Sequence, residues 1–119
     1  MNILFINYPK CSTCRKAAKW LEEHGLEFES RDIVTENPTK SEILEWSALT
    51  PLQLPKIFNT SGLKYKALKL KDVVHVAPQE QLVELLASDG MLVKRPILVT
   101  PQKVLFGFKE DEWTELLLK

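Results

Sequence analysis

The residues best suited to chemistry in this sequence are two cysteines, Cys11 and Cys14, which are separated by two residues. Cysteines with this spacing can close a disulfide across one helical turn and so exchange electrons with other thiols and disulfides. The same spacing also occurs in half of a zinc site, and a pair of cysteines can be purely structural. The pair alone therefore leaves three interpretations open.

The residues around the pair predict a strand, a turn and a helix. The apolar run Asn2–Ile6 is short and is followed by Pro9, which favours a strand over a helix. After Cys11, apolar residues recur at helical spacing, at Ala17, Ala18 and Leu21. Gly25 then follows as a helix stop. We therefore expect Cys11 in the first helical turn, where free backbone N–H groups and the helix dipole stabilise a thiolate.

This setting favours redox chemistry over the other two interpretations. A thiolate at Cys11 is a usable nucleophile, and Cys14 lies within reach to resolve a mixed disulfide. Arg15 adds positive charge one turn further on. A zinc site needs about four ligands, and His24 and His75 have no paired spacing. We predict a redox-active pair and no metal.

Composition restricts the class of protein. The chain has 119 residues, 45% of them hydrophobic and 27% charged, which is typical of one globular domain spanning residues 1–119. A formal net charge of zero gives no indication of direct nucleic-acid binding. No apolar run is long enough to cross a bilayer, and the first residues do not resemble a signal peptide. Two cysteines in one redox-type motif favour a reducing compartment, so we expect a cytoplasmic protein.

The middle of the chain predicts an exposed strand and then several helices. Glu27–Ile33 alternates as an edge strand would, and Thr39 with Glu42 forms a capping box for a helix that ends near residue 48. Thr50, with Gln53 three residues later, predicts a second capped helix with Pro51 at its first position. The lysine-rich stretch 63–76 is interpreted as a solvated face whose apolar residues turn inward, namely Leu63, Ala67, Leu68 and Leu70. The alternative is a weak anion-binding or partner surface.

The last third predicts a helix at 79–88, a hairpin and a final helix. Ile97–Val99 has the β-branched, apolar character of a central strand, and Pro96 stands just before it, where a strand tolerates proline. Residues 104–108 form the return strand, and residues 110–118 form an amphipathic helix. The three tryptophans, Trp20, Trp46 and Trp113, lie on predicted helices and are expected to be packing residues.

Together these elements predict an α/β, thioredoxin-like fold. It comprises a four-stranded mixed sheet with a helical insertion at about 36–90. In such folds the proline before the central strand, here Pro96, is cis and faces the reactive cysteine. Taken by itself, Arg95 before this proline can be read as a surface arginine at the end of a strand.

Several segments together resemble the ArsC/Spx family. These are residues 9–17 around the cysteines, 36–38, 58–62, 92–97 and 107–111. The resemblance covers the whole chain. It is closest to the small ArsC-like proteins of Gram-positive bacteria that keep a Cys-x-x-Cys.

The resemblance implies a site. In the arsenate reductases of this family the first cysteine, matched by Cys11, attacks arsenate, and three arginines hold the oxyanion. Arg95 matches one of them, which implies a place beside Cys11 in contact with the thiolate or the anion. Asn59 and Phe108 stand at the other two positions, so we expect arsenate activity to be weak or absent. Cys14 also departs from these reductases, which typically have serine there. The further binding residues implied are Ser12, Thr13, Arg15, Asn59 and Pro96.

The resemblance also implies partners. An ArsC-like enzyme needs no bound cofactor, but it needs an external thiol reductant such as glutaredoxin with glutathione, or thioredoxin. Spx instead uses the pair as a redox switch and binds the C-terminal domain of the RNA polymerase α subunit. Spx-like regulators usually continue past the last helix, whereas this sequence ends at Lys119. We therefore take an oxidoreductase as the leading hypothesis and a regulator as the alternative.

Overall fold

A computed structural model describes residues 2–119 as a mixed four-stranded sheet with helices on both faces. The strands lie in the order β2-β1-β3-β4. Their bounds are β1 Leu4–Asn7, β2 Glu29–Asp32, β3 Ile97–Val99 and β4 Val104–Phe106. β1 pairs parallel with β2 and antiparallel with β3, and β3 pairs antiparallel with β4. The predicted edge strand, central strand and hairpin are all present, and the thioredoxin-like fold is confirmed.

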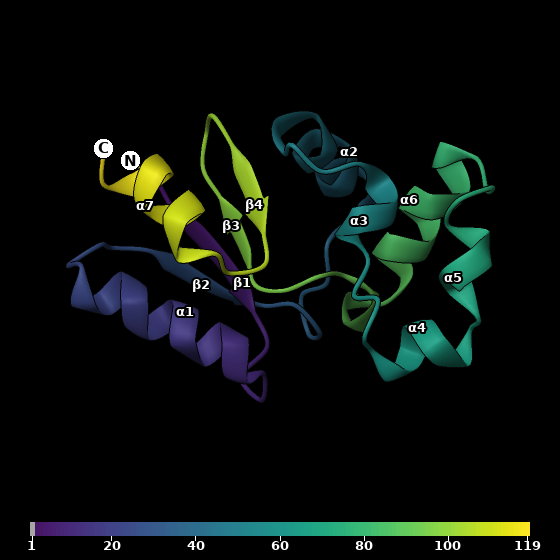
Figure 1. Cartoon of the computed structure of the whole chain (residues 1–119), viewed down its shortest axis with the longest axis horizontal. Coiled ribbons are helices and arrows are strands. Elements are labelled where there is room, and N and C mark those ends of the chain that lie inside the picture. The colour runs from purple at the N-terminus through teal and green to yellow at the C-terminus, as the bar shows by residue number, and fades with distance from the viewer. Residues whose placement is uncertain (1) are drawn as a thin grey trace.

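The helices form two layers around this sheet (Figure 1). α1 and α7 cover one face, and the segment between β2 and β3 forms a helical group on the other side. The helices are α1 Ser12–Glu23, α2 Lys40–Leu49, α3 Leu54–Ile57, α4 Leu63–Ala67, α5 Leu70–Val73, α6 Gln79–Ser88 and α7 Glu110–Leu117, with a 3-10 turn, η1, at Gly90–Leu92. None of the helices between residues 2 and 119 is long and apolar enough to cross a membrane.

Alternation along the strands divides the core between these layers. Phe5 and Leu98, which are partners in the sheet, face α1 and α7, where Trp113 is fully buried. Their neighbours Ile6 and Ile97, also partners, face the helical group. Successive strand residues point to opposite faces, so β1, β3 and β4 each contribute to both cores. Trp20, Trp46 and Trp113 are all buried, as expected of packing residues.

One predicted helix start was wrong. The helix after α2 does not begin with a Thr50 cap and Pro51; instead, α3 begins at Leu54 with Gln53 as its N-cap. The reason is Pro55, which has no N–H and whose ring clashes inside a helix but fits the first turn. The helix therefore begins at Leu54, which places Pro55 in its first turn. The Thr50 hydroxyl accepts a hydrogen bond from the Leu52 N–H instead.

The lysine-rich stretch also differs from expectation. Leu63 is 86% exposed and Leu68 is 45% exposed, so neither turns inward. Lys69 adopts a left-handed conformation, with φ of 54°, and separates α4 from α5. Ala67 is exposed as well, whereas Leu70 is buried as expected. The other buried residues of this stretch are Tyr65 and Val74.

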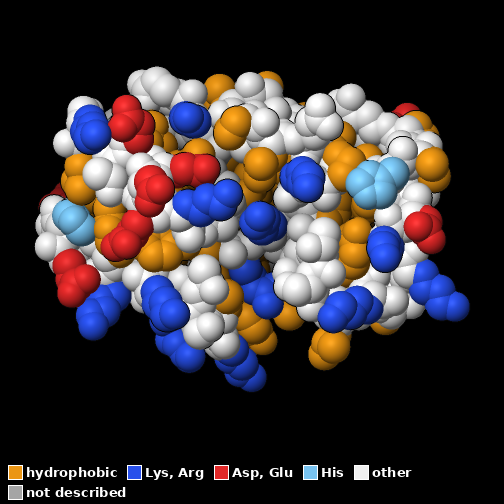
Figure 2. Space-filling view, viewed as in Figure 1, with side chains coloured by type: hydrophobic (Ala, Val, Ile, Leu, Met, Phe, Trp, Pro, Cys, Tyr) orange, Lys and Arg blue, Asp and Glu red, His pale blue; other side chains and the backbone are white. Residues whose placement is uncertain are grey.

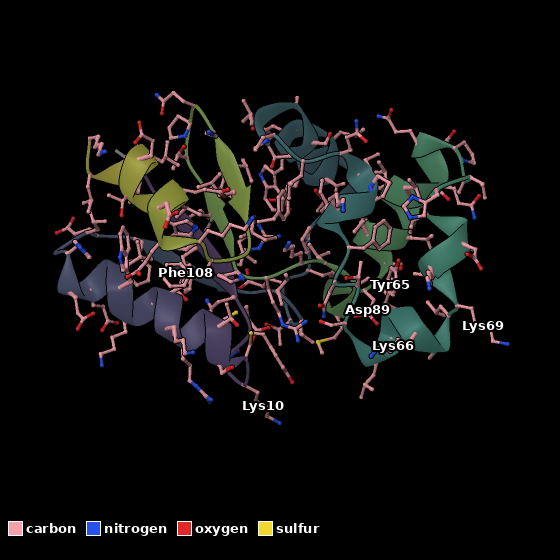
Figure 3. All side chains as sticks on the ribbon, viewed as in Figure 1. Lys10, Tyr65, Lys66, Lys69, Asp89 and Phe108 are labelled. Atoms are coloured by element: carbon pink, nitrogen blue, oxygen red, sulfur yellow. The ribbon has the colours of Figure 1, made fainter. Side chains whose placement is uncertain are left out.

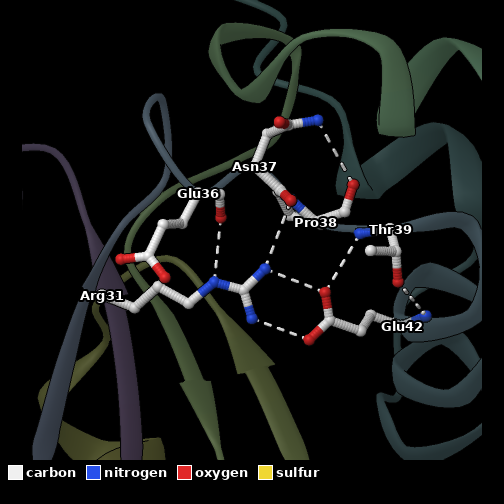
Figure 4. A network of polar contacts seen from close by, with 6 residues as sticks. All are labelled: Arg31, Glu36, Asn37, Pro38, Thr39 and Glu42. Atoms are coloured by element: carbon white, nitrogen blue, oxygen red, sulfur yellow. Dashed lines mark hydrogen bonds and ion pairs between the residues drawn. The ribbon is translucent and has the colours of Figure 1, made fainter.

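A polar network joins the edge strand to the helical group (Figure 4). Arg31 of β2 makes a two-pronged bond to the Glu42 carboxylate, at 2.7 and 2.8 Å. Glu42 also accepts a hydrogen bond from the Thr39 N–H, which completes the predicted capping box of α2. The ion pair raises the pKa of Arg31 and lowers that of Glu42. One carboxylate therefore fixes both the start of α2 and its position against the sheet.

Candidate active site

The first wall of the site is the junction between β1 and α1. The loop after β1 turns back, so that the Cys11 N–H donates to the Tyr8 carbonyl at 2.9 Å. Cys11 then serves as the N-cap of α1 with an extended backbone, ψ 120°. Cys14 follows one turn later and is buried, whereas Cys11 is half-buried. Gly25, with φ of +65°, ends the helix as the sequence predicts.

The pKa values of the two thiols are shifted in opposite directions. Partial burial opposes ionisation of Cys11, but the backbone N–H and thiol of Cys14, together with Arg95, lower the pKa of Cys11 overall. Burial raises the pKa of Cys14 to about 12, despite the Tyr8 N–H that donates to its Sγ at 3.5 Å. Cys11 is thus the more acidic thiol of the pair.

The opposite wall is held by a short bridge between two distant loops. Phe58 pairs with Val93 as an isolated antiparallel bridge. On either side of it the Asn59 N–H donates to the Leu92 carbonyl at 2.8 Å, and the Lys94 N–H donates to the Ile57 carbonyl at 2.7 Å. This bridge fixes the backbones of Asn59 and the segment leading to Arg95 next to each other.

A close backbone contact fixes the start of the same segment. A Cβ on Gly90 would lie 1.8 Å from the carbonyl oxygen of Ile33, which directly follows β2. Only glycine allows this approach. At the other end of this run the Gly107 N–H donates to the Pro96 carbonyl at 2.8 Å. The run from Gly90 to Pro96, in which the Arg95–Pro96 peptide bond is cis, is therefore held at both ends.

Arg95 reaches the cysteines from this wall. Its guanidinium carbon lies over the Tyr8 ring, 5.3 Å from the centroid. Its Nε and Nη1 atoms are buried and have no hydrogen-bond partner among the described residues. Arg95 therefore presents buried donors and a positive charge beside Cys11, where they stabilise an anion.

The two walls enclose a cleft of about 380 Å³. Of the residues selected from the sequence, it brings together Cys11, Thr13, Asn59 and Arg95, and Pro96 follows Arg95 directly. Phe108 also lines the cleft, at the place expected for an arginine (Figure 3). Ser12 and Arg15 are exposed on the first turn of α1 and do not line it.

Three residues of the site were not singled out from the sequence. Tyr8 contacts both Arg95 and Cys14, while Lys94 and Lys109 line the cleft. The two lysines could have been found from their positions in the sequence, since Lys94 precedes Arg95 and Lys109 follows Phe108. No such signal marked Tyr8, whose ring meets Arg95 only in the fold. Among residues 2–119 there is no group of three or more His, Cys, Asp or Glu side chains that could hold a metal ion.

Comparison with known proteins agrees with this geometry. The model of the ArsC family matches residues 6–116. The chain belongs to the ArsC family. The match includes both cysteines, the bridge and the Arg95–Pro96 peptide, so it covers every wall of the cleft.

This chain is similar to an uncharacterized protein, to a transcriptional regulator and to an ArsC-family-related protein of known structure. The uncharacterized protein YusI of Bacillus subtilis is 49% identical over 115 residues, covering 97% of this chain and 98% of YusI. The global transcriptional regulator Spx of Listeria innocua is 34% identical over 104 residues, covering 87% of this chain and 78% of Spx. A crystal structure of an ArsC-family-related protein from Bacteroides fragilis has a TM-score of 0.94 and 49% identity, with 98% of each chain covered.

Proposed function

We propose that this protein is a thiol–disulfide oxidoreductase of the ArsC type, with Cys11 as nucleophile and Cys14 as resolving cysteine. The observation that carries the proposal is that the pKa values of two neighbouring thiols, Cys11 and Cys14, are shifted in opposite directions beside Arg95. The pKa of the half-buried Cys11 is lowered by Cys14 and Arg95, while burial raises that of Cys14 to about 12. A thiolate at the mouth and a protonated thiol behind it suit sequential attack and resolution.

The reaction proceeds in two exchanges. The Cys11 thiolate attacks one sulfur of a disulfide, so a Cys11–substrate S–S bond forms, the substrate S–S bond breaks and the other substrate sulfur leaves as a thiolate. Cys14 then passes its proton to that thiolate or to water and attacks Cys11, which releases the second substrate thiolate. The substrate gains two electrons and the protein is left with a Cys11–Cys14 disulfide. An external dithiol, or two molecules of a small thiol, reduces it again.

Alkylation of Cys11 across a pH range tests the proposal. The rate of reaction with iodoacetamide follows the thiolate fraction, so its midpoint reports the pKa of Cys11. We expect a midpoint clearly below the ordinary value of about 8.5 for a cysteine. A midpoint at or above that value would mean that Cys11 is not activated. We place this chemistry in the cytoplasm, where such pairs are kept reducible.

The likeness to Spx favours a second candidate, a redox-sensing regulator that binds the RNA polymerase α C-terminal domain. The same disulfide would then act as a switch and not as a step of turnover. Pull-down with that domain, using the reduced and the oxidised chain in parallel, separates the two. Binding that depends on the oxidation state supports the regulator, and sustained turnover of a disulfide with a recycling thiol supports the enzyme.

A further inference from the structure

The cleft beside Cys11 continues into a second hollow. A neighbouring cavity of about 580 Å³ shares Asn59, Ser61, Gly62 and Arg95 with the cleft, so the two form one groove. The second cavity extends along α4 and reaches Leu63 and Met91. A nucleophilic thiol therefore lies at one end of a groove that is much longer than a small oxyanion requires.

Positive charge is concentrated along this groove. Lys94, Arg95 and Lys109 line the first cavity, and Lys64 lines the second. The one carboxylate among the lining residues, Asp89, is paired with Lys64 at 3.5 Å. With four cations and one carboxylate, the groove is strongly positive in a chain whose formal net charge is zero.

Basic side chains also lie outside the groove, on the lower edge of the molecule. In Figure 3, Lys10 and Lys66 lie along the same lower edge of the molecule, one from the loop before α1 and the other from α4. Figure 2 shows basic side chains along that lower edge, whereas many of the acidic side chains on this face lie in its upper left part, over α7. This segregation creates a local positive field around the thiol.

The second cavity also offers apolar contacts. Leu63 is 86% exposed at its edge, and Ala67 and Met91 line it. A leucine that is this exposed next to a groove is a candidate contact for a partner. A free oxyanion would use the cations but not these apolar groups, whereas a polypeptide segment can use both.

From this combination we infer that the groove binds an acidic polypeptide that carries the disulfide exchanged with Cys11. The inference rests on the proposed function, since it names the substrate class of that thiol pair. The partner cysteine lies at Cys11, its acidic neighbours face Lys64, Lys94 and Lys109, and an apolar side chain contacts Leu63 and Met91. The chemical steps are those given above, with the acidic polypeptide as the disulfide that is reduced.

Three short peptides test the inference. Each has one cysteine activated as a 2-pyridyl disulfide and one leucine, and the residues around the cysteine are glutamate, glutamine or lysine. Attack by Cys11 on the peptide sulfur forms the mixed disulfide and releases 2-thiopyridone, whose absorbance gives the rate. At low salt we expect the acidic peptide to react about tenfold faster than the neutral one, and the basic peptide to react more slowly. Near 0.1 M salt, where the Debye length is about 10 Å, the difference should shrink.

Charge reversal locates the effect. Lys66→Glu should lower the ratio of the acidic to the neutral rate about 3- to 10-fold. The matched control, Lys103→Glu, reverses an exposed lysine on the β3–β4 turn and should leave that ratio unchanged. Equal rates for the three peptides, or equal effects of both reversals, would overturn the inference. Tight binding of a DNA oligonucleotide that is lost in Lys66→Glu, without any advantage for the acidic peptide, would overturn it as well.

A small neutral probe keeps the two proposals apart. Reaction with 2,2′-dipyridyl disulfide measures the reactivity of Cys11 without docking. If this reaction is slow and has the pH midpoint of an ordinary thiol, the proposed function fails. If it is fast and the peptides are not distinguished, the function stands and only the acidic partner is rejected.

Discussion

The guanidinium of Arg95 lies over the ring of Tyr8, 5.3 Å from its centroid, while the backbone N–H of Tyr8 donates to Cys14 Sγ. One residue of the β1–α1 loop thus contacts both the cation and the resolving thiol. The ring helps to position Arg95, because a cation over an aromatic face is attracted to it. The N–H stays with the backbone and does not depend on the side chain. The two contacts can therefore be separated by mutation.

We expect Arg95→Gln to raise the pKa of Cys11, because the substitution removes the positive charge beside the thiolate. Alkylation of Cys11 near neutral pH should slow about 3- to 10-fold, and Arg95→Lys should restore part of the rate. Tyr8→Leu should have a smaller effect in the same direction, since it removes only the ring that orients Arg95. Lys19→Gln removes an exposed charge further along α1 and serves as the control. An unchanged midpoint in Arg95→Gln would show that Arg95 does not stabilise the thiolate.

The two cysteines should also differ sharply in labelling. At pH 8 the reduced chain should take up one equivalent of iodoacetamide quickly, at Cys11, because the pKa of Cys14 is raised to about 12 and the thiol is buried. In Cys14→Ser, a mixed disulfide at Cys11 should accumulate in place of the intramolecular one, and mass spectrometry of the intact protein would detect it. Fast double labelling of the folded chain would contradict this assignment.

Arsenate should be a poor substrate. Asn59 donates at most neutral hydrogen bonds and Phe108 donates none, and Lys94 and Lys109 supply charge but not the two-pronged geometry of arginine. A well-formed charge-assisted bond contributes roughly 1.5–3 kcal/mol. We therefore expect Asn59→Arg to strengthen arsenate binding by about 10- to 100-fold. Steady-state reduction with glutaredoxin and glutathione, or with thioredoxin, measures this. Efficient turnover by the unchanged chain at micromolar arsenate would show that the lysines replace the arginines.

The Arg31–Glu42 ion pair should make the free energy of unfolding depend on pH in the acidic range. The folded-state pKa of Glu42 is lowered, first by its hydrogen bond to Arg31, so its contribution is present above the unfolded value of about 4.3 and is lost as pH falls through the folded value. Glu42→Gln should cost about 2 kcal/mol of unfolding free energy at pH 7. Urea unfolding of both proteins should show this difference shrinking between about pH 5 and pH 3. A constant difference over that range would mean that the carboxylate charge is not the cause.

Much of the fold could be predicted from local patterns. The short apolar run before Pro9, the Thr39–Glu42 box and Gly25 each determine their element by local physics, and each was placed correctly. The start of α3 was missed because two competing signals, the Thr50 cap and Pro55, lie five residues apart. Pro55 prevails, since a missing N–H and a steric clash outweigh a cap.

The site was predictable only in part, for a different reason. Cys11, Cys14 and Arg95 could be selected because their residue types carry chemistry. The contacts that position them are between distant segments: the bridge from Phe58 to Val93 and the ring of Tyr8 under Arg95. Neither contact can be predicted from the spacing of nearby residues, because each depends on how the helical group folds back onto the sheet.

The contact of Gly90 with Ile33 has a consequence for how this chain tolerates changes in length. Between these two residues lies the whole helical group, and loops there can lengthen or shorten at little cost, because loop-closure entropy grows slowly. From Gly90 to Pro96 no such freedom exists, since Gly90 lies against the Ile33 carbonyl and the Pro96 carbonyl accepts a hydrogen bond from the Gly107 N–H. One residue inserted in this run would move Arg95 away from Cys11. Natural and engineered variation in length should therefore accumulate before Gly90, while the distance from Gly90 to the arginine stays constant.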